Sequence, residues 1–248
     1  MLKKVYFIIA MQMLLLSSSV AAEAMDMKQR AFMAVKVKAD RGDANSQFAL
    51  GGMYYQGIVT DKDYPAAAVL YEKAADQGHL KAMYNLGEMY LRGEGVKKDI
   101  PMAINLFSKA ANAGDTKSII HLADILYIGQ DIEKNYKKAF YWYKIAADAG
   151  YPIAQHRVGT MYKYGLGVGK DIQQAKVYLK KSAMQSYGDA QYELGMMYLE
   201  GDDGFAKNPE EAKQLIQDAY LNGTPEAKVI LDQEHWNVKT DDSELPQE

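Results

Sequence analysis

The sequence contains no cysteine and only four histidines among its 248 residues. Without cysteine the chain can form no disulfide and offers no thiol for lipid attachment, so its stability must come from packing. The histidines are His79, His121, His156 and His235, and no two are three or four residues apart. Because a zinc site on one helix needs that spacing, we expect neither a metal nor a cofactor.

An excess of positive charge is also missing. The formal net charge is −3, and no run of Lys or Arg is longer than a pair such as Lys3-Lys4. A surface that binds nucleic acid is normally basic, so we expect no nucleic-acid partner. Acidic residues gather after Asp232, which makes the C-terminus an acidic tail on a nearly neutral body.

The apolar run near the N-terminus, from Val5 to Leu16, is shorter than the roughly 20 residues that cross a membrane. It follows two lysines and precedes small residues, which is the layout of a secretory signal peptide. Cleavage is expected after Ala22, with Ala24 as second choice, and a retained membrane helix is the less favoured alternative. The expected product is a periplasmic or secreted monomer of bacterial type, with no integral membrane segment.

A motif that recurs every 36 residues is the most informative feature of the chain. The strings LGGMYYQG, LGEMYLRG, LADILYIG, VGTMYKYG and LGMMYLEG begin at Leu50, Leu86, Leu122, Val158 and Leu194. A second string follows each of them, in order AAVLYEKAADQG, AINLFSKAANAG, AFYWYKIAADAG, AKVYLKKSAMQS and AKQLIQDAYLNG, the last displaced by one residue. Apolar and small residues recur at three- and four-residue steps in both strings, which predicts two helices per repeat.

Residues typical of helix ends flank each second string. An Asp or Asn, whose side-chain oxygen can accept from free backbone amides, precedes it at Asp63, Asp99, Asn135, Asp171 and Asn208. A glycine, suited to the left-handed turn after a helix, ends it at Gly78, Gly114, Gly150 and Gly223. We therefore predict an all-α chain of about five tandem antiparallel helix pairs.

Half of the repeat recurs at each end of the array. Residues 31–42 align with a second helix, and residues 225–231 resemble a shortened first helix. Such half-repeats would cover the apolar faces of the terminal repeats. The predicted order is a signal peptide over 1–22, a capping helix over 23–42, five repeats over 43–223, a capping half-repeat over 224–236 and an acidic disordered tail over 237–248.

The combined pattern A-x-Y-x-L-G-x-M-Y-x-x-G-x-G-V-x-x-D, then A-x-x-x-Y/F-x-x-A-A-x-x-G, resembles the Sel-one-like repeat of the tetratricopeptide superfamily. The resemblance covers residues 28–231 and is most complete over 82–114, whereas the third repeat departs most, with Ala123 in place of a glycine. It implies a right-handed α-solenoid whose concave face binds proteins. Some secreted relatives with a disulfide in each helix pair are linked to penicillin binding, but this chain lacks their cysteines.

The positions expected to face a partner come from analogy with tetratricopeptide arrays. They lie two before and two, five and six after the Leu or Val of each first helix. In this chain they combine tyrosines with charges of both signs, as interface centres do. The predicted binding residues are Tyr55, Tyr84, Glu88, Arg92, Tyr127, Lys163, Tyr164 and Tyr192. For Tyr84 and Tyr192, a place in the core is an equal alternative.

Catalytic motifs are missing from the sequence. The string GLGVGK at Gly165–Lys170 has Tyr164 where a phosphate-binding loop needs glycine and Asp171 where it needs Ser or Thr, so it is interpreted as an inter-helix turn. We predict no catalytic residues and a protein-interaction module, either an adaptor, a regulator or an inhibitor or immunity-type clasp. The alternatives are an enzyme acting on cell wall or β-lactams, and a glycan-binding module that uses the tyrosines.

The N-terminal layout predicts processing during export. Chain recovered from the envelope or medium of its native host should begin at residue 23 or 25, because signal peptidase cleaves after small residues. N-terminal sequencing and intact mass measure this directly. A cytoplasmic product that still begins at Met1 would show that the prediction is wrong.

Overall fold

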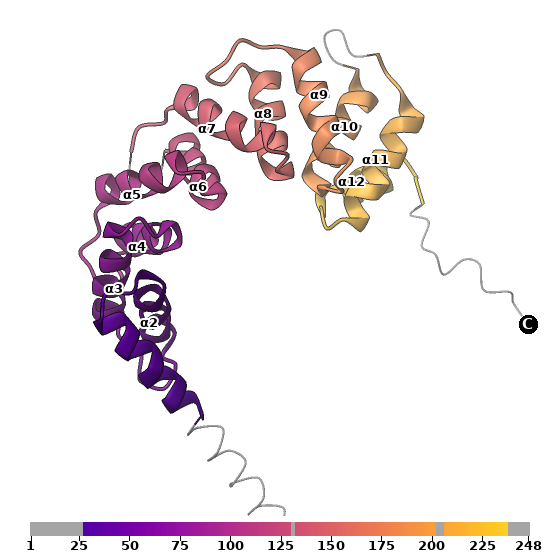
Figure 1. Ribbon diagram of the computed structural model, residues 1–248. Helices are drawn as coiled ribbons and strands as arrows, with labels where there is room; N and C mark the ends of the chain where they lie inside the picture. Colours follow the sequence, from indigo (N-terminus) through magenta and orange to yellow (C-terminus); the bar gives the residue numbers. More distant parts are fainter. Residues whose placement is uncertain (1–26, 130–131, 202–205, 238–248) are drawn as a thin grey trace, which may run out of the picture. The chain divides into compact units, whose positions relative to one another are not determined.

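The computed structural model describes residues 27–129, 132–201 and 206–237. Within these ranges the chain forms α-helices joined by turns, and no strand occurs (Figure 1). The chain divides into two compact units, Met1–Asp115 and Thr116–Glu248. The predicted signal peptide and the part of the acidic tail beyond Asn237 lie outside the described residues.

The first unit contains a helix over residues 27–40 and two helix pairs. The pairs are α2 (Ala44–Gln56) with α3 (Tyr64–Asp76), and α4 (Leu80–Arg92) with α5 (Ile100–Asn112). Each helix packs against the next, and the helix over 27–40 buries Phe32 and Ala39 in a cluster with Leu50 of α2. The terminal apolar face of α2 is thereby covered.

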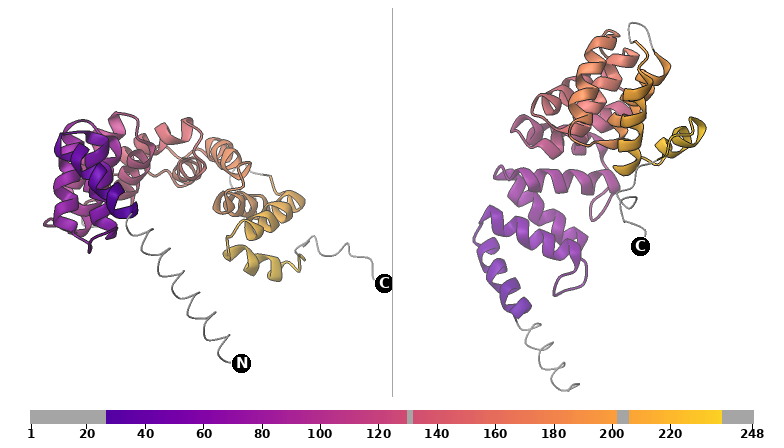
Figure 2. Two further views of the ribbon diagram at one scale, coloured as in Figure 1. Left: turned by 60° about the horizontal axis from the view of Figure 1, so that its bottom comes forward. Right: turned by 90° about the vertical axis from the view of Figure 1, so that its right-hand side faces the viewer.

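The second unit contains three helix pairs and one short helix (Figure 2). They are α6 (Thr116–Ile128) with α7 (Tyr136–Asp148), α8 (Pro152–Tyr164) with α9 (Ile172–Ala183), α10 (Gly188–Glu200) with α11 (Pro209–Leu221), and α12 (Glu226–Gln233). Helix α12 buries Ala227 and Leu231 against Ile216 of α11. None of the helices in the described part of the chain has the length and apolar character needed to span a bilayer.

The predicted helix-end chemistry is confirmed. At all five predicted N-caps the side-chain oxygen accepts from the amide three residues later, at 2.9–3.3 Å. The four predicted turn glycines have φ between +85° and +94°. Ser186 holds the same position in the fourth repeat with φ +60°, so the repeat geometry imposes this conformation even on a residue with a side chain.

A small residue in each first helix lets the two helices of a pair approach closely. A Cβ added to Gly87 would lie 2.8 Å from two ring atoms of Phe107, and one added to Gly159 would lie 2.8 Å from Cγ of Leu179. Both partner side chains have no exposed surface. The third repeat has Ala123 here, itself fully buried, so this position takes at most a methyl group in the described repeats.

Buried glutamine side chains link three of the helix pairs to the helix that precedes them. Gln155 donates from Nε2 to the carbonyl of Ala147 at 3.2 Å and accepts from Gln185 at 2.8 Å. The same contacts recur at Gln47 and Gln191, with equivalent partners. Because the buried amide is hydrogen-bonded through both its nitrogen and its oxygen, it favours one register between the helices that it joins.

Replacement of Gly87 by Leu should lower the free energy of unfolding by about 1 to 3 kcal/mol, because the added side chain overpacks against Phe107. Urea unfolding followed by circular dichroism measures this. Gly52→Ala is the control: its Cβ would lie 3.6 Å from the Tyr71 hydroxyl, an ordinary contact. Since alanine favours helix, the control should be neutral or stabilising by up to about 1 kcal/mol. Equal effects of the two changes would contradict the packing explanation.

Candidate functional site

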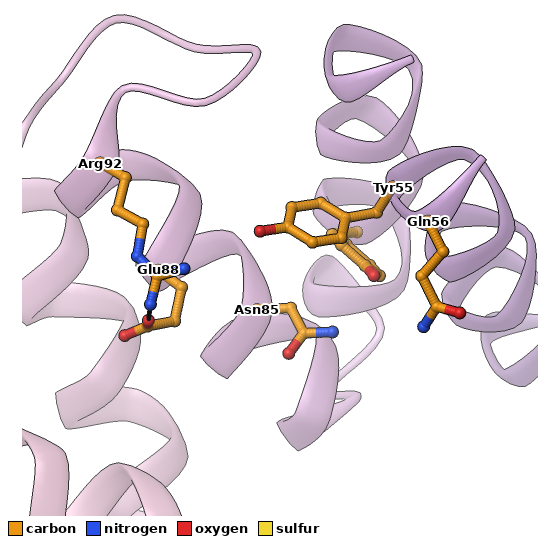
Figure 3. Close-up of a pocket in the computed structure, with 6 residues that line it drawn as sticks. Tyr55, Gln56, Asn85, Glu88 and Arg92 are labelled. Carbon is orange, nitrogen blue, oxygen red and sulfur yellow. Dashed lines mark hydrogen bonds and ion pairs between the residues drawn. The ribbon is translucent and has the colours of Figure 1, made fainter. Parts of the chain in front are cut away.

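Three of the predicted residues line one cavity in the first unit. Tyr55, Glu88 and Arg92 surround a volume of about 280 Å³ together with side chains of Asn85 and other neighbours (Figure 3). The Tyr55 ring extends from the last turn of α2, and Glu88 and Arg92 lie one turn apart on α4. Their side chains form an ion pair with 2.5 Å between Oε2 and Nη2.

The Tyr55 hydroxyl is held by an acid in the turn after α4. It donates to Oε2 of Glu94 at 2.6 Å. The hydrogen bond to this carboxylate, together with burial, raises the pKa of Tyr55 to about 12. The phenol is therefore protonated and fixed in position at neutral pH, beside an ion pair whose charges compensate each other.

Three further predicted residues line a larger cavity in the second unit. Lys163, Tyr164 and Tyr192 contribute to a volume of about 570 Å³ whose walls come from α8, α10 and the start of α12. The other lining residues are His156, Thr160, Asp189, Glu193, Met196, Glu200, Thr224 and Glu226. Acids outnumber bases in this set.

Glu193 is the best-connected acid of the second-unit cavity. Its Oε2 accepts from Oγ1 of Thr160 at 2.7 Å and lies 3.0 Å from Nε2 of His156, and its Oε1 lies 3.3 Å from Nζ of Lys163. Burial alone would raise the pKa of Glu193. The hydrogen bonds from His156 and Thr160 and the charge of Lys163 outweigh burial and hold this pKa below its ordinary value.

The interaction with Glu193 also keeps Lys163 charged. Burial alone would lower its pKa, but the Glu193 carboxylate and the neighbouring Tyr164 raise it above the ordinary value. The ammonium lies 5.2 Å from the centroid of the Tyr164 ring, a cation–π distance. Because 59% of Tyr164 is exposed, its ring is accessible to solvent at the second-unit cavity. The ring lies next to the ion pair of Lys163 and Glu193.

The structure places the remaining two predicted residues outside these two cavities. The ring of Tyr84 is half-buried with its centroid 5.6 Å from that of Phe107 of α5. Tyr127 is half-buried with its centroid 5.3 Å from that of Tyr136, and Cζ of Arg157 lies 5.7 Å from its ring. Both tyrosines therefore contribute to contacts between helices.

One helix position that lines both cavities was not predicted from the sequence. It is the residue before the first-helix Leu or Val, which is Asn85 in the first-unit cavity and Glu193 in the second-unit cavity. This position precedes two predicted ones by three and seven residues, so all three share one stripe of the helix. Extending that stripe backwards from Glu88 by three residues would have found it. No local signal marks Glu226, because its place depends on how α12 packs.

A comparison with known protein families shows to which family the chain belongs. The Sel1 repeat profile matches five consecutive segments, residues 44–79, 80–115, 116–151, 152–187 and 188–224. The chain belongs to the Sel1 repeat family. Its fifth Sel1 repeat is one residue longer than the other four, in agreement with the displaced second string.

Two solved structures resemble this Sel1 repeat chain. One is c5321, a protective antigen of uropathogenic Escherichia coli strains with an SLR fold, 30% identical with a TM-score of 0.79. It covers 86% of this chain, which spans only 46% of that protein. The other is a Sel1 repeat protein from Oxalobacter formigenes, 33% identical over 81% of this chain and 83% of its own, with a TM-score of 0.68. No curated protein matches the sequence.

The family match and these structures confirm the predicted fold class of tandem helix-pair repeats. Sel1 repeats are typically scaffolds for protein interaction rather than catalysts. Across residues 27–237, apart from the two short gaps, no group of three His, Asp or Glu side chains is placed to hold a metal ion. The two cavities therefore offer recognition groups: tyrosines, amides and fixed charges.

Glu193→Gln should destabilise the Sel1 repeat fold at pH 7 by about 1 to 2 kcal/mol, because it leaves half-buried Lys163 without its counter-charge. The folded-state pKa of Glu193 is lowered, so its ionised form stabilises the fold above the ordinary carboxyl value, about 4.3. The difference between wild type and variant should therefore shrink as the pH falls from 7 toward 3.

Urea midpoints at both pH values measure this difference. Glu200→Gln is the matched control, because Glu200 lines the same cavity but is exposed. Its effect should stay within about 0.5 kcal/mol at either pH. A loss of stability for Glu193→Gln that is the same at both pH values would show that its charge is not the cause.

Proposed function

We propose that this chain is an exported, non-catalytic module that binds a partner protein through the face of its first helices. The observation that carries the proposal is the second-unit cavity, where exposed Tyr164 lies beside the half-buried ion pair of Lys163 and Glu193. The Sel1 repeat fold supports an interaction role, and the N-terminal layout supports export. The likeness to a protective antigen is consistent with an accessible location.

The energetics of interfaces favour this assignment. Binding energy is concentrated in a few aromatic or arginine anchors at water-excluding centres, and truncating one costs about 2 kcal/mol or more. Tyr164 is suited to be such an anchor, because the Lys163 ammonium beneath its ring restricts the ring before a partner arrives. A restricted side chain loses less conformational entropy on binding than a free one.

The first-unit cavity is smaller and also combines a tyrosine with an ion pair. Tyr55 is fixed by Glu94, and Arg92 is paired with Glu88 while remaining 57% exposed. An ion pair at the rim of an interface contributes mainly to orientation and association rate. We propose that it is a secondary contact for the same partner class, in an adaptor, a regulator or an inhibitor or immunity-type clasp.

Tyr164→Ala should weaken partner capture about tenfold, which corresponds to about 1.4 kcal/mol. Tyr141→Ala is the matched control, because Tyr141 is also 59% exposed but lies on the second helix α7. Immobilised wild type and both variants are incubated with envelope extract, and recovery of each bound protein is quantified by mass spectrometry. A partner retained equally by wild type and Tyr164→Ala but lost with Tyr141→Ala would place the binding face on the second helices.

A further inference from the structure

We propose that the second-unit cavity receives an arginine side chain of the partner protein. This inference rests on the proposed function for the existence of a partner, but the cavity itself can be tested without one. Its volume of about 570 Å³ lies within the range of sites that enclose small ligands. It can therefore hold a long side chain.

The charge of the cavity selects a cation. Four carboxylates line it, those of Asp189, Glu193, Glu200 and Glu226, against the single ammonium of Lys163. Lys163 is already paired with Glu193, so the other three carboxylates are not balanced by it. In the described part of the chain none of these three takes part in an ion pair. An acidic ligand would meet repulsion here, and a basic one attraction.

A buried histidine adds the need for a hydrogen-bond donor. His156 lines the cavity and is only 9% exposed. Because ionised Glu193 can only accept, the hydrogen between them belongs to Nε2 of His156. In the neutral ring Nδ1 is then an acceptor, and it has no hydrogen-bond partner among the described residues. A cationic ligand rich in N–H groups would supply both the charge and the donor.

Arginine fits this combination better than a metal ion. No three His, Asp or Glu side chains of the described residues are placed to hold a metal. The carboxylates of Asp189, Glu193 and Glu200 follow one another along α10, and that of Glu226 lies at the start of α12. A guanidinium matches spread acceptors because it carries five N–H donors in a plane. Tyr192 and Met196 give the wall an apolar part, against which the methylene stem of arginine can pack.

The test is a titration of the ¹⁵N-labelled whole chain with N-acetyl-arginine methylamide, followed by amide chemical shifts. The expected result is saturable shifts on α8 and α10, with a dissociation constant on the order of 1 mM. N-acetyl-glutamate methylamide should give none. Glu200→Gln/Glu226→Gln should weaken arginine binding at least about fivefold, because ion pairing is removed on two sides.

Glu210→Gln/Glu211→Gln is the matched control. It removes the same charge from two exposed residues of α11 that do not line this cavity, so affinity should change less than about twofold. Equal weakening by both double variants, binding of the glutamate probe, or no saturable shift with arginine would overturn the proposal. Shifts of the same amides with calcium chloride but not with arginine would also overturn it, in favour of an inorganic cation.

The two proposals fail separately. Loss of partner capture by Tyr164→Ala without any arginine binding would keep the interaction role and remove the arginine site. Arginine binding that disappears in Glu200→Gln/Glu226→Gln, with no partner affected by Tyr164→Ala, would keep the arginine site and overturn the proposed face.

Discussion

Close contact between the two helices of each repeat is the constraint on which the rest of the structure depends. Gly87 and Gly159 bring the first helix against buried Phe107 and Leu179, at distances that exclude a larger side chain. This contact orients the first helix, because only one of its faces can carry the small residue and the neighbouring Leu or Val. The opposite stripe is left to face cavities and solvent.

In α4 and in α10, three of the residues that line a cavity lie on one stripe of the helix. In α4 the stripe holds Asn85, Glu88 and Arg92, which line the first-unit cavity as a neutral set with an internal ion pair. In α10 the same positions hold Glu193, Met196 and Glu200, which make the second-unit cavity acidic. The two cavities therefore differ in these side chains, and also in the short helix α12, which contributes Glu226 to the second-unit cavity.

The charge of Glu193, the least exposed acid of the second-unit cavity, is compensated by its neighbours. Glu193 receives hydrogen bonds from His156 and Thr160 and pairs with Lys163, which offsets the cost of burying a charge. All three partners belong to α8, the first helix of the preceding repeat. The same contacts therefore set the ionisation of the cavity and hold consecutive repeats together.

Local rules allowed the sequence by itself to determine the repeat length, the helix pairs, the N-caps and the glycine turns. Each of these depends on residues only a few positions apart, as when Asp63 accepts from the third amide after it. The helix stripe that lines the cavities was predicted only in part. The roles of Glu193 and Glu226, and the half-buried places of Tyr84 and Tyr127, were decided by tertiary structure. Those depend on which side chains of neighbouring helices meet, and partners such as His156 and Glu193 lie 37 residues apart in the chain, beyond the reach of any local pattern.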